Sequence, residues 1–327
     1  PLHTLLALLI ISSCGGGGSS ASAPDNTGDD GGGGGGGPLG SISISGCSDE
    51  IAASFLDISL APGPGSSYTV MPNVSISCTD TQLSITSNAI PHYTYIATTP
   101  NALNEANLSK SITLNPEIAS DITLIGNPNN GANVQLGYLG FTNTGLPWYG
   151  PTEAAQPAQE AYGDAIYNAV LGNCGGHTSP NSFHEHTLIE ICFRVEGLVA
   201  EPWALGLDET VPSGLVGYAA DGFKVYGQWE YPDGDSSQAL TQLQSSYTLI
   251  SGQSPQSYAF EAYQYNESLH SGSTQYLDRC NGHQHADGSQ YHYHITPATF
   301  PYIIGCFKGT PSAPVSYTHL RAHETKC

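Results

Sequence analysis

The sequence predicts a mainly β, irregular domain that is cross-linked by disulfides, with few short helices and an internal duplication. Three observations support this fold class. Short stretches alternate polar and apolar residues between Asn, Gly and Pro, as half-buried strands do. Six cysteines lie in the central part of the chain. A unit that reads C-x-G-H, polar loop, H-x-H and closing Cys occurs twice, which indicates two related substructures.

Residues 1–14 have the pattern of a lipoprotein-type export signal with a truncated start. The apolar run from Leu5 to Ile11 is too short to span a bilayer. It leads into Ile11-Ser12-Ser13-Cys14, which resembles a bacterial lipobox, where the cysteine becomes the lipid-modified first residue. The alternative is a buried strand that ends in Cys14. We expect Cys14 to anchor the protein to a membrane of the bacterial cell envelope, facing the periplasm or the cell surface.

Two further segments are expected to lie outside the folded domain. Residues 15–40 contain two glycine runs and offer too little apolar surface to offset the entropy of ordering the chain, so they predict a flexible tether. Residues 311–327 form a tail. Its segment from Val315 to Thr325 looks like a translated sequencing adapter, and we expect an assembly artefact there; a genuine polar tail is the alternative.

The folded part is expected to divide at residue 78. Residues 41–77 begin with the alternating Ser41-Ile42-Ser43-Ile44 and predict an N-terminal β-hairpin layer, with a small separate module as the alternative. Residues 78–310 form the main domain. Helices are expected only at 152–170 and 236–246.

The charge of the chain excludes one class of partner. There are 28 acidic and 7 basic residues, a formal net charge of -21, whereas phosphate backbones are bound by clustered Lys and Arg. No nucleophile elbow, P-loop or dinucleotide fingerprint is present. The expected partner is the membrane through the lipid anchor, without nucleic acid, and a small-molecule or protein partner stays open.

Six cysteines in an exported chain predict disulfides. Sequence spacing alone allows fifteen connectivities for six cysteines, but the repeat favours closure within each copy. The favoured pairs are Cys174 with Cys192, Cys280 with Cys306 and, by remainder, Cys47 with Cys78. The alternative is a crossed pairing that joins one copy to the other.

The histidines of the repeat predict a metal site. In a strand, His184 and His186 share one face, as do His292 and His294, and a third imidazole could come from the preceding loop. Because disulfide-forming conditions remove free thiolates, imidazole would dominate the ligand set; zinc or copper fits best, with iron or nickel as the alternatives. A buried network of His and Tyr that braces the loops is the alternative. The candidate ligands are His177, His184, His186, His283, His285, His292 and His294.

At these residues the chain resembles the YHYH-domain family, named for the tetrapeptide Tyr291-His292-Tyr293-His294. The resemblance covers roughly 78–310. The first copy departs from it, since Phe183-His184-Glu185-His186 replaces the Tyr-rich form. The family implies no established activity, so the resemblance defines boundaries more than function. Further matching segments are Ser87 to His92, Asn127 to Asn129, Cys174 to His177, Gly217 to Gly227, Leu277 to His283 and Phe300 to Gly309.

Two functional hypotheses follow. In the first, the protein is a metal-dependent envelope enzyme, with Asp221 or Glu185 as a candidate base near the histidines. In the second, it is a non-catalytic metal-binding or structural module. The Asp221-Gly222 pair also fits a simple turn.

Overall fold

The computed structural model describes residues 39–127, 129, 131–134, 136–154, 161–180 and 182–312. The expected export signal, Cys14, nearly all of the tether and the tail from 313 onward lie outside these residues. The described residues belong to one compact unit, Gly37–Cys327. Among them, no helix is both long and apolar enough to cross a membrane.

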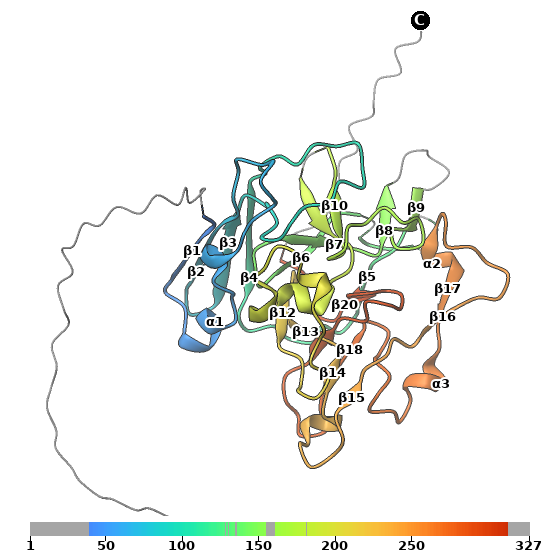
Figure 1. Cartoon of the computed structure of the whole chain (residues 1–327). Coiled ribbons are helices and arrows are strands. Elements are labelled where there is room, and N and C mark those ends of the chain that lie inside the picture. Colours follow the sequence, from blue (N-terminus) through green and yellow to red (C-terminus); the bar gives the residue numbers. More distant parts are fainter. Residues whose placement is uncertain are drawn as a thin grey trace, which may run out of the picture. The chain divides into compact units, whose positions relative to one another are not determined.

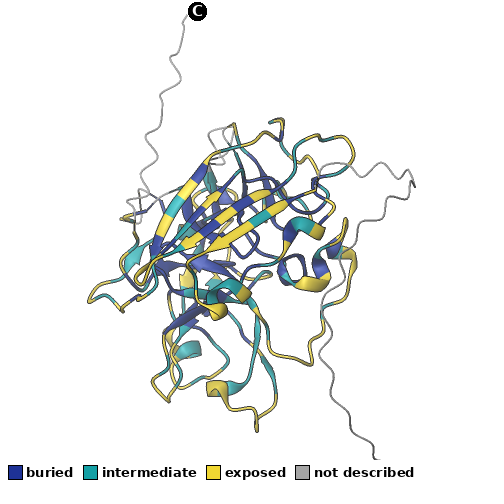
Figure 2. Ribbon diagram, turned by 90° about the vertical axis from the view of Figure 1, so that its left-hand side faces the viewer, coloured by how far each residue is buried: buried dark blue, intermediate teal, exposed yellow. Residues whose placement is uncertain are grey.

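Strands dominate the fold, and the predicted alternation is clearest in a four-stranded sheet. Val74, Ile76, Leu83 and Ile85 point into the core, whereas the serines between them face outward. Figure 1 shows this sheet on the left of the view, and Figure 2 shows its exposed face. The strands, in sheet order, are β1 (Ser41–Ser45), β2 (Asn73–Cys78), β3 (Gln82–Ser87) and β4 (Leu108–Thr113).

The first two strands do not form the predicted hairpin. β1 and β2 pair in parallel, with Ser41 opposite Asn73, and parallel pairing needs a long crossover. The connection supplies it with α1 (Asp49–Ala53) and a 3₁₀ turn (Ile58–Leu60). Because β3 and β4 complete the same sheet, this segment is joined to the main domain.

A second, eight-stranded sheet carries both His repeats. Its central strands β6 and β12 pair antiparallel. From this pair outward, each half has an antiparallel, a parallel and again an antiparallel pairing. The order is β10 (Gly176–Thr178), β11 (Phe183–Glu185), β7 (Pro147–Tyr149), β6 (Tyr138–Thr142), β12 (Leu215–Ala219), β13 (Lys224–Tyr226), β19 (His292–His294) and β18 (Gly282–His283).

The remaining elements are short. The helices are α2 (Ala259–Ala262) and α3 (Glu267–His270), with 3₁₀ turns at Glu190–Phe193, Val195–Gly197, Pro202–Ala204 and Pro232–Gly234. The two-stranded sheets pair β5 (Thr123–Leu124) with β20 (Cys306–Phe307), β8 (Thr152–Ala154) with β9 (Ala161–Asp164), β14 (Trp229–Glu230) with β15 (Thr241–Gln242), and β16 (Tyr247–Leu249) with β17 (Tyr263–Tyr265).

Both predicted longer helices are wrong within the described residues. In 152–170, Thr152 pairs with Asp164 across β8 and β9; residues 155–160 are not described. In 236–246, the backbone N–H of Leu243 donates to Gln228 instead of forming a helical bond. Sheet partners distant in the sequence override the local helical pattern in both places.

The three disulfides are those favoured by the repeat: Cys47–Cys78, Cys174–Cys192 and Cys280–Cys306. The crossed alternative is therefore wrong. The second and third bonds close the loops that carry the two His motifs.

The core lies against the eight-stranded sheet. Trp148, Phe141, Tyr218 and Tyr293 are fully buried there, and Phe55 stacks on Tyr218 from the first crossover. This packing fixes the strands from which the histidines project.

Candidate metal centres

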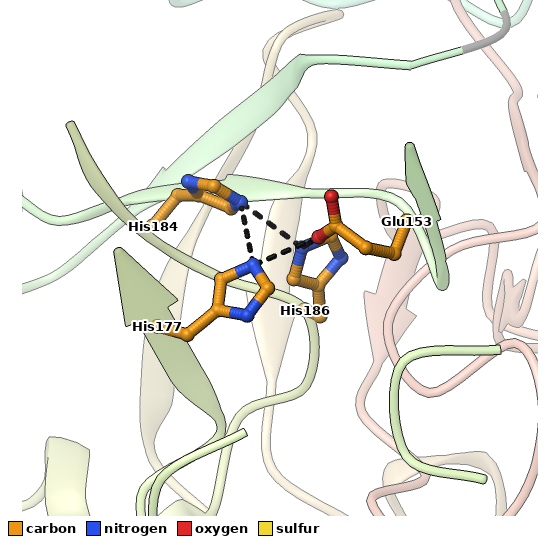
Figure 3. Close-up of side chains that lie close together, drawn as sticks. All are labelled: Glu153, His177, His184 and His186. Atoms are coloured by element: carbon orange, nitrogen blue, oxygen red, sulfur yellow. Dashed lines mark hydrogen bonds and ion pairs between the residues drawn. The ribbon is translucent and has the colours of Figure 1, made fainter. Parts of the chain in front are cut away.

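The first centre is built on a strand pair at one end of the eight-stranded sheet. β10 and β11 pair so that His177 lies directly opposite His184. His186 follows two residues later and returns to the same face, as the alternation predicts. Glu153 of β8 completes the group. Figure 3 shows the three imidazoles and Glu153 turned toward a common point.

The distances in the first centre are those between ligands of one ion. His184 Nε2 lies 3.2 Å from His177 Nε2 and 3.0 Å from His186 Nε2. Glu153 Oε2 lies 2.8 Å from His177 Nε2 and 3.0 Å from His186 Nε2. Bonds of about 2.0–2.1 Å to a tetrahedral zinc would separate the donors by roughly 3.3 Å. The cluster is therefore close to the size that zinc requires.

Backbone carbonyls fix which ring nitrogen faces the centre. His177 Nδ1 donates to the carbonyl of Val170 at 3.0 Å, and His186 Nδ1 donates to Gly150 at 2.6 Å. Since a carbonyl only accepts, both Nδ1 atoms carry the proton, and in the neutral rings Nε2 presents a lone pair. Metal-binding histidines are oriented in this way.

The second centre repeats this construction at the other end of the sheet. β18 and β19 place His283 opposite His292, with His294 two residues on. The Nε2 atoms of His283 and His292 are 3.1 Å apart. Glu230 of β14 lies opposite them, with Oε2 at 2.8 Å from His283 Nε2 and 3.4 Å from His294 Nε2.

The same orienting bonds recur in the second centre. His294 Nδ1 donates to Gly227 at 2.6 Å, as His186 does to Gly150. His292 Nδ1 donates to Gln290 at 3.1 Å. A fourth imidazole, His285, lies 3.1 Å from Glu230 Oε1.

Burial and the close imidazoles set the charge of the carboxylates. Burial alone would raise the pKa of Glu153, but the interactions with His177 and His186 outweigh it and hold that pKa well below its usual value. In the same way His283, His292 and His294 outweigh burial and lower the pKa of Glu230. Both carboxylates are therefore ionised, as ligands to a cation are.

Two imidazoles are held neutral. Burial, with His186 and His177 nearby, lowers the pKa of His184 well below its ordinary value. Burial lowers the pKa of His294 to about 4. At neutral pH these rings carry no charge and keep a nitrogen lone pair, the form in which histidine binds metals.

The two centres differ in access. In the first, the side chains of His177 and His186 are 3% and 2% exposed, whereas His283 and His285 in the second are 16% and 12% exposed. The second centre also opens on a cavity of about 370 Å³. The cavity is lined by Lys224, Tyr226, Trp229, Glu230, His285 and His292, among others.

The seven predicted ligands thus fall into two groups, and sequence reasoning missed one member of each. Glu153 and Glu230 come from strands outside the C-x-G-H and H-x-H segments. A signal for them exists, since Tyr149-Gly150-x-x-Glu153 and Tyr226-Gly227-x-x-Glu230 share one pattern. Each tyrosine packs on the imidazoles of its own centre, Tyr149 on His184 and Tyr226 on His292.

The two candidate bases lie away from the imidazoles. Glu185 alternates with His184 and His186, so it takes the opposite face, where Tyr93 donates to it at 2.5 Å. Asp221 accepts a 2.6 Å hydrogen bond from Tyr293, which lies between His292 and His294 and also faces away. Burial raises the pKa of both carboxyl groups. Their contacts are those of core polar groups and do not support the role of a base at either centre.

The family model described as YHYH protein matches residues 109–309, a segment that contains both centres. No curated protein and no solved structure matches the chain.

Proposed function

Because the chain belongs to the YHYH protein family, whose function is open, we propose a function from its two centres. The protein is a metal-binding protein of the bacterial cell envelope, anchored through a lipid on Cys14, that holds a transition metal ion in each centre. Zinc or copper suits donor sets of imidazole and one carboxylate. The three disulfides support an oxidising compartment.

The metal proposal rests on one observation. Imidazole nitrogens and carboxylate oxygens that accept hydrogen bonds converge in the first centre, and neutral rings supply too few N–H groups to donate to all of them. In the neutral rings the Nε2 atoms of His177 and His186 are acceptors, because Nδ1 of each ring donates to a backbone carbonyl, and the Glu153 carboxylate adds further acceptors 2.8 Å and 3.0 Å from them. With neutral rings, the only proton left is one on His184. The Oε2 atom of Glu153 is buried and forms no hydrogen bond, and the same holds for Oε2 of Glu230. Such clustering is costly unless a cation lies between the groups.

Elemental analysis tests this proposal. The full chain is stripped with a chelator, reloaded with zinc or copper and desalted, and we expect about two equivalents of bound metal, one for each donor set. Replacing His184 and His186 by Ala should remove one equivalent, and replacing His292 and His294 should remove the other. His270→Ala is the matched control, since His270 Nδ1 bonds to Tyr276 away from both centres. Less than about 0.2 equivalents in the reloaded wild type would refute the proposal.

A catalytic second centre is a further candidate, favoured by the cavity beside it. A bound ion with a free position would act there as a Lewis acid or, if it is copper, in electron transfer. The first centre, whose imidazoles His177 and His186 are more deeply buried, would serve stability. Water-proton relaxation of the copper-loaded protein tests this difference: enhancement should come from the second centre and disappear in the His292→Ala/His294→Ala variant. Relaxation unchanged by that variant would contradict a solvent-open second centre.

We also infer that the two centres arose by duplication of one unit. The sheet is paired in the same way from β6 and β12 outward, and the orienting carbonyls, tyrosines and glutamates recur at one spacing. The corresponding positions are Gly140 and Gly217, Gly145 and Gly222, Tyr149 and Tyr226, Gly150 and Gly227, and Glu153 and Glu230.

A further inference from the structure

His285 is a ligand of the second centre that has no counterpart in the first. The paired histidines His177 and His283 begin equivalent loops. Two residues after His177 stands Ser179, whereas two residues after His283 stands His285. The other histidines and the glutamate correspond one to one, so this position is the chemical difference between the two donor sets.

The ring of His285 extends the second centre on one side. In the first centre, His177, His184 and His186 form one triangle with ring centroids 4.8–4.9 Å apart. In the second, His294 lies 5.0 Å from His283 and 4.9 Å from His292, and His285 lies 5.1 Å and 4.9 Å from the same two rings. The four rings therefore form two triangles that share the edge between His283 and His292.

Glu230 divides its oxygens between these two triangles. Its Oε2 contacts His283 and His294, while its Oε1 lies 3.1 Å from His285 Nε2 and 3.3 Å from His292 Nε2. The donor atoms of Glu230, His283, His285 and His292 all lie within 4.8 Å of one another, and His294 lies beside them on the other side of the shared edge. The first centre offers three imidazoles and a carboxylate.

A turn holds His285 in this position. Gly234, with φ +71°, leaves room for the ring, because a Cβ there would lie 3.1 Å from His285 Nδ1. Asp233 in the same turn accepts from the backbone N–H of Ala286 at 3.4 Å. The imidazole is therefore packed in place beside the centre and is not a free surface side chain.

We propose that His285 is the specificity-determining ligand, and that it makes the second centre prefer copper(II) over zinc more strongly than the first. This inference rests on the proposed function. Four-donor sets suit zinc, which is tetrahedral in its structural sites. Copper(II) favours tetragonal coordination by nitrogen and oxygen, which a fourth imidazole helps to supply.

Metal competition tests the role of His285. Each centre is studied alone, in the His184→Ala/His186→Ala and the His292→Ala/His294→Ala backgrounds of the full chain, with equimolar copper(II) and zinc in a weak chelator buffer. The bound copper-to-zinc ratio should be at least about tenfold higher for the second centre, since even outer-shell changes alter metal affinity by 10–100-fold. His285→Ser, which copies the residue of the first centre, should abolish that difference. An unchanged ratio in His285→Ser would overturn the inference.

A measurement without substitution at His285 covers the case in which that variant fails to fold. Pulsed electron paramagnetic resonance of copper in the second centre should count four coordinated imidazoles, and in the first centre three. Three in both would overturn the role of His285 while leaving metal binding intact. Absence of metal from both centres would instead refute the proposed function itself.

Discussion

The carbonyl oxygen of Gly227 accepts a 2.6 Å hydrogen bond from Nδ1 of His294. Gly150 makes the same bond with His186. Each glycine lies three residues before the glutamate of its centre, so a single short segment orients one imidazole and supplies the carboxylate. The backbone of this segment therefore controls both parts of the donor set.

The two glycines should respond differently to alanine. A Cβ on Gly227 would collide with the carboxyl group of Glu190, whereas one on Gly150 would meet only Leu139 and Ile125 at 3.3 Å and 3.4 Å. Gly227→Ala should cost about 1–3 kcal/mol of unfolding free energy and weaken metal binding at the second centre. Gly150→Ala is the milder matched change. Urea unfolding and metal titration check this, and equal effects would contradict the packing argument.

Removal of a carboxylate should affect only its own centre. Glu153→Gln keeps the shape but loses the charge, and we expect metal affinity at the first centre to fall about 10–100-fold. Glu230→Gln should do the same at the second centre. Glu185→Gln is the control, because Glu185 lies on the opposite face of β11. Competition with a calibrated chelator measures each affinity; a loss in Glu185→Gln as large as in Glu153→Gln would contradict the assignment.

His92 should make stability depend on pH. Burial lowers the pKa of His92 to about 4, below about 6.5 in the unfolded chain. Its stabilising effect is complete above pH 6.5 and is lost as the pH falls through 4, because protons then bind the unfolded chain more strongly. The unfolding free energy contributed by His92 therefore falls by about 3 kcal/mol over this pH range. In metal-free protein, His92→Gln, which can still donate to the carbonyl of Cys192, should reduce the slope of the unfolding free energy between pH 7 and 4, while His184 and His294 keep their own contributions. A slope equal to that of the wild type would rule out this role.

The disulfide Cys280–Cys306 should stabilise the loop that carries the second centre. Its cysteines are separated by 26 positions in the sequence, and replacing both by alanine should lower the unfolding free energy by about 3.5 kcal/mol in the chain-entropy estimate. Calorimetry measures the loss. Mass mapping of non-reduced wild-type peptides is the companion experiment, and a peptide that joins Cys174 to Cys280 would contradict the pairing.

The proposed lipid anchor on Cys14 makes a separate prediction. With an intact export signal, Cys14→Ser should leave the protein unlipidated and move it from the membrane fraction to the soluble envelope fraction. Incorporation of labelled fatty acid measures the modification. Ser13→Ala is the control, since the lipid would attach to the cysteine. Labelling that persists in Cys14→Ser would refute the anchor.

The sequence predicted what depends on local geometry. His184 and His186 share a face because strand side chains alternate, and the disulfide partners follow from the repeat. Glu153 and Glu230 were missed because only tertiary packing of β8 and β14 brings them to the imidazoles. The catalytic roles considered for Asp221 and Glu185 rested on nearness in sequence. A difference of one position along a strand turns a side chain to the other face, as Glu185 shows.

The outermost strands of the eight-stranded sheet, β10 and β18, are three and two residues long. Each carries a histidine directly opposite a histidine of its neighbour. A bound ion would therefore fasten each border strand to the sheet, next to the disulfide that closes the same loop. Loss of the ions would allow the edge strands β10 and β18 to separate from the sheet. The backbone groups that they cover would then be unpaired and could form hydrogen bonds with a strand of another chain. Metal supply would thus govern aggregation as well as ligand chemistry.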